Sequence, residues 1–211
     1  MDQVNTPVNP EDASQLHRSC VLEGTLVGLA KLRREDIPTM TRWFQNLEYS
    51  AYLGTFGFAA TVEDETAWFE RNAIFQPNEA VQFAIIELAT GQHVGNCGLF
   101  DIHRPSDTAT LGIGIGEPTC WGKGFGTEAV RLLVEYGMFF LNLWHIKLFH
   151  TAWNERGHRA YQKAGFREVG RLTKSIRLGH ERFDEVIMEI TRDDVDLSRI
   201  RAKLRLLTDS P

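Results

Sequence analysis

Three glycines alternate within one short segment, and this segment limits the possible folds more than any other part of the chain. Gly122, Gly124 and Gly126 stand between a strand-like stretch and a long amphipathic helical pattern. Glycine lets the backbone turn tightly, so that successive N–H groups can point into one concavity. The positive end of the following helix dipole adds to their effect. The segment therefore predicts an anion-binding loop between a strand and a helix, in a chain of α/β type.

Hydrophobic periodicity on either side of this loop predicts the other elements. Strands are expected over residues 21–32, 81–88, 93–102, 108–116, 145–150, 167–178 and 183–190. Helices are expected after Asp36, from about 61–64, and over 126–141, 154–164 and 192–207. Asp36 is expected to cap the first helix, and the aromatic, glycine-rich segment 52–58 is expected to be a loop. This order gives an α/β domain of the α+β type, with a mixed sheet and helices on both faces.

The chain divides into three parts. Residues 1–20 are polar and show no periodicity, so we expect a flexible N-terminal tail. Residues 21–191 are expected to form one domain, and residues 192–211 a C-terminal helical extension. The apolar stripe of this extension needs a partner surface, which is either a second copy in a homodimer or the chain's own domain.

Charge and cysteine content exclude several classes of function. A net charge of −5 argues against nucleic-acid binding through bulk electrostatics, and the longest apolar stretch, 136–144, is too short to span a membrane. No signal-peptide pattern is visible, and the three cysteines lack CxxC spacing, so a reducing, cytoplasmic location is expected. The seven histidines lack paired spacing with carboxylates, which argues against a metal site.

Charge is unevenly distributed along the chain. Residues 1–153 hold 10 basic and 18 acidic side chains, whereas residues 154–207 hold 13 basic and 9 acidic side chains. The acidic portion would suit a cationic substrate, but a solvated surface with no steering role explains the same counts equally well.

Two well-known phosphate-binding motifs nearly fit the glycine segment and fail on spacing. A P-loop needs Gly-x-x-x-x-Gly-Lys-Ser/Thr, but Glu117 stands at the first glycine position and Gly124 at the hydroxyl position. A dinucleotide fingerprint over 124–129 needs an acidic residue at the end of the next strand, which instead ends in Phe149-His150-Thr151. Neither motif accounts for the loop.

The segment Trp121-Gly122-Lys123-Gly124-Phe125-Gly126-Thr127 resembles motif A of the GNAT acetyltransferases, Arg/Gln-x-x-Gly-x-Gly/Ala. Other segments resemble the same family in the same order. These are 109–116 (its fourth strand), 154–156 with Tyr161 and 164–166 (its Asn…Tyr…Gly-Phe motif), and 183–188 (the last strand of its RimJ/RimL-like branch). The resemblance covers about residues 22–191. It implies the GNAT fold, a mixed, mostly antiparallel twisted sheet flanked by helices, with splayed fourth and fifth strands.

The resemblance also implies which residues bind acetyl-CoA, the cosubstrate of this family. The backbone of residues 113–115 would pair with the pantetheine arm like an added strand. The N–H groups of 122–127 would cradle the pyrophosphate, while Lys123 either adds charge near a phosphate or remains a solvated loop residue. Asn154 would bond the pantetheine arm, cap the following helix, or do both. The implied cofactor-binding set is Ile113, Gly114, Ile115, Trp121, Gly122, Lys123, Gly124, Phe125, Gly126, Thr127, Asn154 and Tyr161.

The implied chemistry is direct acyl transfer, in which an unprotonated primary amine attacks the thioester. Tyr161 matches the family tyrosine that protonates the departing CoA thiolate, with a packed helix tyrosine as the alternative. The backbone N–H of Ile113 would stabilise the oxyanion. The base is unassigned, because Thr110 stands where relatives often carry Glu, and Trp121 replaces Arg or Gln at the first motif position.

The acceptor pocket is expected near the aromatic segment 49–58, since this family binds its acceptor there. The candidate substrate residues are Tyr49, Tyr52, Phe56 and Phe58. The amine could belong to a small molecule or to a protein N-terminus. Two other functions stay open: a transferase that uses a longer acyl-CoA, and a catalytically silent acyl-CoA-binding domain.

Overall fold

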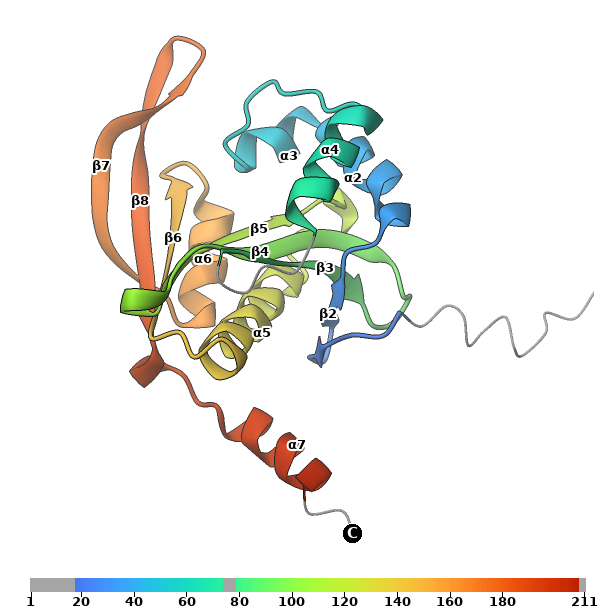
Figure 1. Cartoon of the computed structure of the whole chain (residues 1–211). Coiled ribbons are helices and arrows are strands. Elements are labelled where there is room, and N and C mark those ends of the chain that lie inside the picture. The colour runs from blue at the N-terminus through green and yellow to red at the C-terminus, as the bar shows by residue number, and fades with distance from the viewer. Residues whose placement is uncertain (1–17, 74–78, 209–211) are drawn as a thin grey trace, which may run out of the picture.

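Within residues 18–73 and 79–208, which the computed structural model describes, eight strands form one open sheet (Figure 1). Their order across the sheet is β1-β2-β3-β4-β5-β6-β8-β7. The strands are β1 (Leu22–Glu23), β2 (Val27–Lys31), β3 (Val81–Glu87), β4 (His93–His103), β5 (Thr108–Ile115), β6 (His145–Thr151), β7 (Arg167–Leu178) and β8 (Glu181–Thr191). The β5–β6 pair is parallel and the other neighbouring pairs are antiparallel. The predicted mixed, mostly antiparallel sheet is confirmed.

Helices cover both faces of this sheet. They are α2 (Ile37–Phe44), α3 (Leu47–Tyr52), α4 (Val62–Asn72), α5 (Phe125–Phe140), α6 (Glu155–Ala164) and α7 (Ser198–Thr208). Figure 1 shows α5 and α6 on one side of the sheet and α2, α3 and α4 on the other. The alternation of side chains along β3 supports both layers, since Phe83 and Ile85 join the core under α5. Ala84 and Ile86 instead pack with Trp43 of α2.

The strands β5 and β6 pair over a short stretch and then part. Their parallel register joins residues 108–110 of β5 to residues 145–147 of β6. Beyond it, β5 stays paired with β4 as far as Ile115, and β6 stays paired with β8 as far as Thr151. The later residues of β5 and β6 therefore face each other across a gap within the sheet, and the predicted splay is confirmed.

The start of α2 differs from the prediction. Asp36 makes no side-chain cap bond to this helix. Its carboxylate instead accepts the backbone N–H of Arg33 at 2.7 Å, which caps the 3₁₀ turn that precedes the helix. The same carboxylate pairs with Arg18 at 2.7 Å, so Arg18, which the prediction placed in the tail, contacts the folded domain. Residues 1–17 lie outside the described residues.

A short helix, α3, lies directly before the expected aromatic loop of residues 52–58 and shares only Tyr52 with it. Asn46 caps α3 by accepting two backbone N–H groups of its first turn, at 2.9 and 3.4 Å. Six residues are too few for a periodic pattern, so the polar cap was the one available signal for this helix. The loop begins after Leu53 and turns at Gly54 and Gly57, whose φ values are +75° and +73°.

The C-terminal extension begins its helix at Ser198, later than the predicted residue 192. Leu197 and Ile200 are buried in the core that contains α5. Arg199 pairs with Glu135 of α5 at 2.8 Å. The start of the extension therefore folds back on its own domain, which is one of the two predicted options. Across the described ranges, no helix is both long and apolar enough to cross a membrane.

Candidate active site

The glycine loop before α5 uses backbone conformations that favour glycine. Gly122 and Gly124 have φ values of +76° and +90°, in the left-handed region that other residues rarely adopt. A Cβ at Gly122 would meet nothing within 4 Å, so this glycine borders open space. Gly124 is the N-cap of the sixteen-residue helix α5 and offers no side chain to its first N–H groups. The loop and the helix dipole are therefore open to an anion.

Glu128, in the first turn of α5, fixes the position of this helix. Its carboxylate accepts the backbone N–H groups of Thr25, Leu26 and Val27 at 2.9, 2.6 and 2.7 Å. These three bonds tie α5 to the turn between β1 and β2. Glu128 therefore holds the loop in place, a role that its position in the sequence does not indicate.

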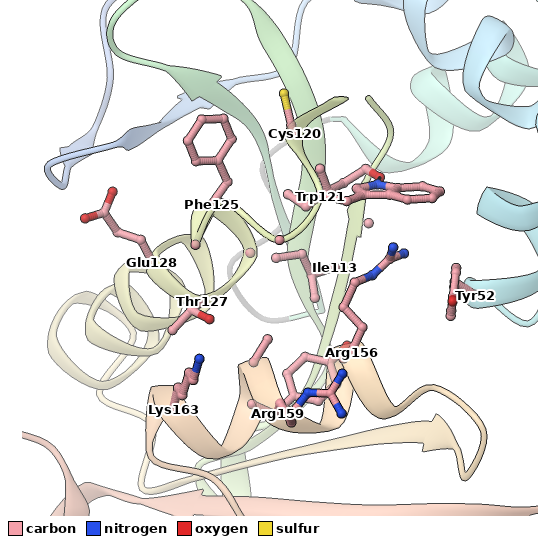
Figure 2. A pocket seen from close by; sticks show the side chains of 18 of the residues that line it. Tyr52, Ile113, Cys120, Trp121, Phe125, Thr127, Glu128, Arg156, Arg159 and Lys163 are labelled. Carbon is pink, nitrogen blue, oxygen red and sulfur yellow. Dashed lines mark hydrogen bonds between the residues drawn. The ribbon is translucent and has the colours of Figure 1, made fainter. Parts of the chain in front are cut away.

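A cavity of about 760 Å³ lies beside the free edge of β5, between the loop and α6 (Figure 2). Its lining includes most of the predicted cofactor-binding residues, namely Ile113, Gly114, Ile115, Trp121, Gly122, Gly124, Phe125, Gly126, Thr127, Asn154 and Tyr161. Lys123 is exposed and is not in the described lining. Tyr49 and Tyr52 of α3 close the other side of the cavity.

Positive charge dominates the cavity wall. Arg131 of α5 and Arg156, Arg159 and Lys163 of α6 line it, and Figure 2 shows the three α6 side chains along one side. In the described lining, Glu128 is the one acidic residue, and its carboxylate is already bonded to three N–H groups. The cavity therefore attracts a ligand that carries several negative charges.

Trp121 joins the loop to β5 and to α6. Its indole N–H donates to the carbonyl of Ile115 at 2.7 Å. The guanidinium carbon of Arg156 lies 3.9 Å from the centroid of Trp121 and 4.4 Å from the centroid of Tyr52. Tyr52 also packs on Trp153, with 4.9 Å between ring centroids. The sequence motif contains Arg156, but it does not reveal aromatic partners that come from distant segments.

Asn154 and Tyr161 both line the cavity from α6. Asn154 is buried and caps α6, because its side-chain oxygen accepts the N–H of Gly157 at 2.9 Å. Burial raises the pKa of Tyr161 to about 12, since a phenolate would lose its hydration there. Tyr161 is therefore a hydrogen-bond donor throughout the physiological pH range.

The four candidate substrate residues do not share one position. Tyr49 and Tyr52 line the cavity. Phe56 lies 6.5 Å from the ring of Trp153, and Phe58 packs edge-on against Phe44 at 5.8 Å. Neither of these phenylalanines belongs to the described lining of the cavity.

A buried acid on α4 also lies on this side of the sheet. Glu65 is 5% exposed, and burial followed by the charge of Asp64 raises its pKa to about 7. Burial raises the pKa of Tyr49, and the nearby charge of Glu65 raises it further. Tyr49 in turn reaches β5, because a Cβ on Gly114 would lie 2.9 Å from its hydroxyl oxygen. The sequence Glu63-Asp64-Glu65 does not single out Glu65, since only the packing of α4 buries it.

The two acids next to β5 in the sequence have structural roles. Glu117 is buried, accepts the indole N–H of Trp43 at 3.0 Å and pairs with Arg42. Asp107 occupies a left-handed turn position, with φ of +49°. Thr110 lies within β5, opposite Phe100 of β4. Glu117, Asp107 and Thr110 are all outside the described lining of the cavity, so none of them supplies a free carboxylate there.

The splayed sheet, the glycine loop and the cationic cavity define an α/β domain whose cavity, at a gap between strands, is suited to a large anionic ligand. The chain belongs to the GNAT acetyltransferase family, since the acetyltransferase (GNAT) domain matches residues 27–167.

Related proteins are named as N-acetyltransferases. The chain is 30% identical over 115 residues to the uncharacterized N-acetyltransferase p20 of Bacillus licheniformis, which covers 54% of this chain and 64% of that protein. It is 28% identical over 149 residues to the spermidine N(1)-acetyltransferase of Escherichia coli K12, with 69% and 75% covered. The chain thus spans just under two thirds of p20, and 66% of a probable N-acetyltransferase of Bacillus subtilis.

Solved structures share the fold. A spermidine N-acetyltransferase from Vibrio cholerae, in complex with CoA and spermine, matches with a TM-score of 0.73 and 20% identity, over 81% of this chain and 98% of that one. A GNAT-family acetyltransferase from Bacillus anthracis matches with a TM-score of 0.71 and 21% identity, over 82% and 98%. The predicted GNAT fold is confirmed.

Proposed function

We propose that this protein transfers an acetyl group from acetyl-CoA to a primary amine by direct attack. The observation that carries the proposal is the cationic cavity beside the free edge of β5, bounded by the glycine loop. Membership in the GNAT family supports the choice of acetyl-CoA as donor. The relatives named as spermidine N-acetyltransferases support an amine as acceptor. The RimJ/RimL-like branch stays a prediction.

The residues around the cavity suit the parts of CoA. The N–H groups of residues 122–127 would hold the pyrophosphate at the start of α5. Arg131, Arg159 and Lys163 would neutralise the remaining phosphate charge. The backbone of residues 113–115 would pair with the pantetheine amides like an added strand, because this edge of β5 faces the gap. Asn154 and Trp121 would border the arm, and Lys123 would add charge from the solvent side.

The chain's own residues would assist the transfer at two points. The backbone N–H of Ile113 would stabilise negative charge on the carbonyl oxygen as the amine attacks. Tyr161 would donate a hydrogen bond to the departing sulfur, whose thiol has an ordinary pKa of ~8.5. Because the pKa of Tyr161 is about 12, it supports the thiolate as a donor more readily than it gives up its proton.

The test is turnover with purified full-length protein. Acetyl-CoA and a panel of primary amines are mixed with the protein, and release of free thiol is followed together with acetylated product by mass spectrometry. We expect turnover with at least one amine and a lower rate with Tyr161→Phe. CoA binding without turnover across the panel would instead indicate a silent acyl-CoA-binding domain. A preference for a longer acyl-CoA would change the donor and leave the transferase class intact.

We also propose a cytoplasmic location, where acetyl-CoA is available and thiols stay reduced. The described cysteines Cys20, Cys97 and Cys120 are free, which is compatible with such a compartment. A homodimer stays a proposal, and sedimentation velocity of the full chain tests it.

A further inference from the structure

Arg156 occupies a distinctive place in the cavity. It stands in the first turn of α6 and reaches between two rings, Trp121 next to the glycine loop and Tyr52 at the end of α3 (Figure 2). The guanidinium carbon lies within 4.4 Å of both ring centroids. Arg156 thus lies between the loop and the helix that closes the acceptor side.

The contacts of Arg156 leave its hydrogen-bonding edge free. In the described part of the chain, its guanidinium contacts these two rings and makes no hydrogen bond or ion pair. Its neighbour Glu155 pairs instead with Arg159, at 3.1 Å. Contact with aromatic faces restricts the movement of a guanidinium without occupying its N–H groups, which remain available for a bidentate anion. Arg156 is therefore prepared for a carboxylate or a phosphate.

Two sources could supply that anion: a phosphate of CoA or a carboxylate of the acceptor. Arg159 and Lys163 stand about one and two turns further along α6, and the guanidinium of Arg131 on α5 donates to the carbonyl of Lys163. This group offers the CoA phosphates a cationic wall of their own. Arg156 contacts Tyr52 of α3 instead, so its position favours the acceptor.

A polyamine acceptor fits this side of the cavity poorly. Free carboxylates stabilise a second ammonium group best, and the one acid of the described lining, Glu128, is already bonded to three N–H groups. Glu117 pairs with Arg42 and Trp43. A second ammonium would therefore lie near the charge of Arg156 with no carboxylate to compensate it.

We propose that Arg156 binds a carboxylate of the acceptor, so that the preferred substrate is a small amine that also carries a carboxylate, such as an amino acid. This inference rests on the proposed acetyltransferase function. In this arrangement Trp121 and Tyr52 hold the guanidinium in position, and the carboxylate sets the distance of the amine from β5. Arg156 is a specificity-determining residue, and the chemistry of acyl transfer does not require it.

The experiment compares acceptors that differ only in the carboxylate. A panel of amino acids, each paired with its own amide, and spermidine are assayed with acetyl-CoA and the full chain. For wild type we expect the best amino acid to exceed spermidine in kcat/KM. In Arg156→Gln, the acid-to-amide ratio of kcat/KM should fall about tenfold or more relative to wild type. Comparing this ratio between proteins cancels the intrinsic difference in amine pKa within each pair.

Two further variants separate recognition from structural damage. Arg156→Lys keeps the charge without the fork, so the ratio should fall less than in Arg156→Gln. Arg159→Gln should raise the KM for acetyl-CoA and leave the acid-to-amide ratio unchanged. The KM for acetyl-CoA should stay within about twofold of wild type in Arg156→Gln, with an unaltered circular-dichroism spectrum.

Several results would overturn the inference. An unchanged ratio in Arg156→Gln would do so, as would spermidine exceeding every amino acid in wild type. A rise in the KM for acetyl-CoA without a change in ratio would assign Arg156 to a CoA phosphate. These three outcomes leave the transferase proposal standing, whereas absence of turnover with every amine would remove both.

Discussion

One side of the cavity is formed mainly by backbone atoms, and the other side is formed mainly by side chains. On the cofactor side, the backbone of residues 122–126 and the edge of β5 provide the surface, and cations stand on α5 and α6. On the proposed acceptor side, the six-residue helix α3 provides Tyr49 and Tyr52, with the buried Glu65 behind them. A surface made of backbone requires glycine and suits one ligand, whereas a surface made of side chains can change with each substitution. We therefore expect the proposed cofactor side to be shared across the family and the proposed acceptor side to vary among its members.

The largest expected effect is a loss of CoA affinity, caused by a substitution on the proposed cofactor side alone. Gly124→Asp places a carboxylate at the anion site and a side chain at φ of +90°, so CoA affinity should fall by at least about 100-fold. Isothermal titration calorimetry with CoA measures it. The matched control is Gly91→Asp, which introduces the same residue at φ of +73° in the turn between β3 and β4. Equal losses in both variants, or wild-type affinity in Gly124→Asp, would contradict the placement of the pyrophosphate.

A smaller effect is expected where the two sides meet. Tyr161→Phe removes one hydrogen bond to the leaving sulfur, so kcat should fall about tenfold while the KM for acetyl-CoA stays unchanged. Because the pKa of Tyr161 is about 12, the wild-type rate should show no loss from its ionisation up to about pH 9. Tyr136→Phe is the control, since Tyr136 packs against Phe83 of β3, away from the described cavity lining. Equal kcat values in the two variants would remove Tyr161 from the mechanism.

The buried Glu65, behind α3, should make the stability of the folded protein depend on pH. The folded-state pKa of Glu65 is about 7, above its ordinary value of 4.5, so the folded state favours the protonated form. The protonated Glu65 side chain therefore contributes fully to folding stability below pH 4.5, and this contribution is lost as the pH rises through about 7. Glu65→Gln should therefore raise the free energy of unfolding by about 1–2 kcal/mol at pH 8, after allowance for partial solvent screening, and leave it unchanged at pH 4.5.

Urea denaturation at the two pH values measures this effect. Asp64→Asn is the control of opposite sign, because hydrogen bonds from Thr61 lower the pKa of Asp64. That variant should be less stable than wild type at pH 8. A Glu65→Gln protein that loses stability at pH 8 would contradict the raised pKa of this carboxyl. A loss of kcat/KM in the same variant, with stability as expected, would show that Glu65 contributes to activity as well as to stability.

The smallest expected effects concern the two asparagines that cap helices, Asn154 at α6 and Asn46 at α3. Asn154→Ala and Asn46→Ala should each reduce the free energy of unfolding by about 1 kcal/mol, since each side chain caps a helix. Their ligand effects should separate, with weaker CoA binding in Asn154→Ala and a higher acceptor KM in Asn46→Ala. Thermal unfolding and steady-state kinetics measure both. Identical kinetic changes in the two variants would show that the two sides of the cavity are not independent.

The same division explains what could be predicted from the sequence. The order and type of the strands follow from periodicity, and the β3 strand, expected over 81–88, is observed over Val81–Glu87. The glycine loop has a local signature because φ values near +80° need glycine. Arg156, Trp121 and Tyr52 meet only after the chain folds, and no local pattern links residues so far apart. The burial of Glu65 likewise depends on how α4 packs, since its acidic neighbours in the sequence are exposed.

The short β5–β6 register has a consequence for the lifetime of the folded protein. Two antiparallel halves of the sheet meet through three residues on each strand, and the rest of this seam is open. The domain resembles a sheet that lacks one strand, which the amides of a bound cofactor arm would supply. Its resistance to unfolding should then grow with the logarithm of the free CoA concentration above the Kd. Backbone amide hydrogen exchange at Ile113 and Ile115 should slow in parallel. The concentration of acetyl-CoA would then determine the stability of the folded protein against unfolding as well as its catalytic rate.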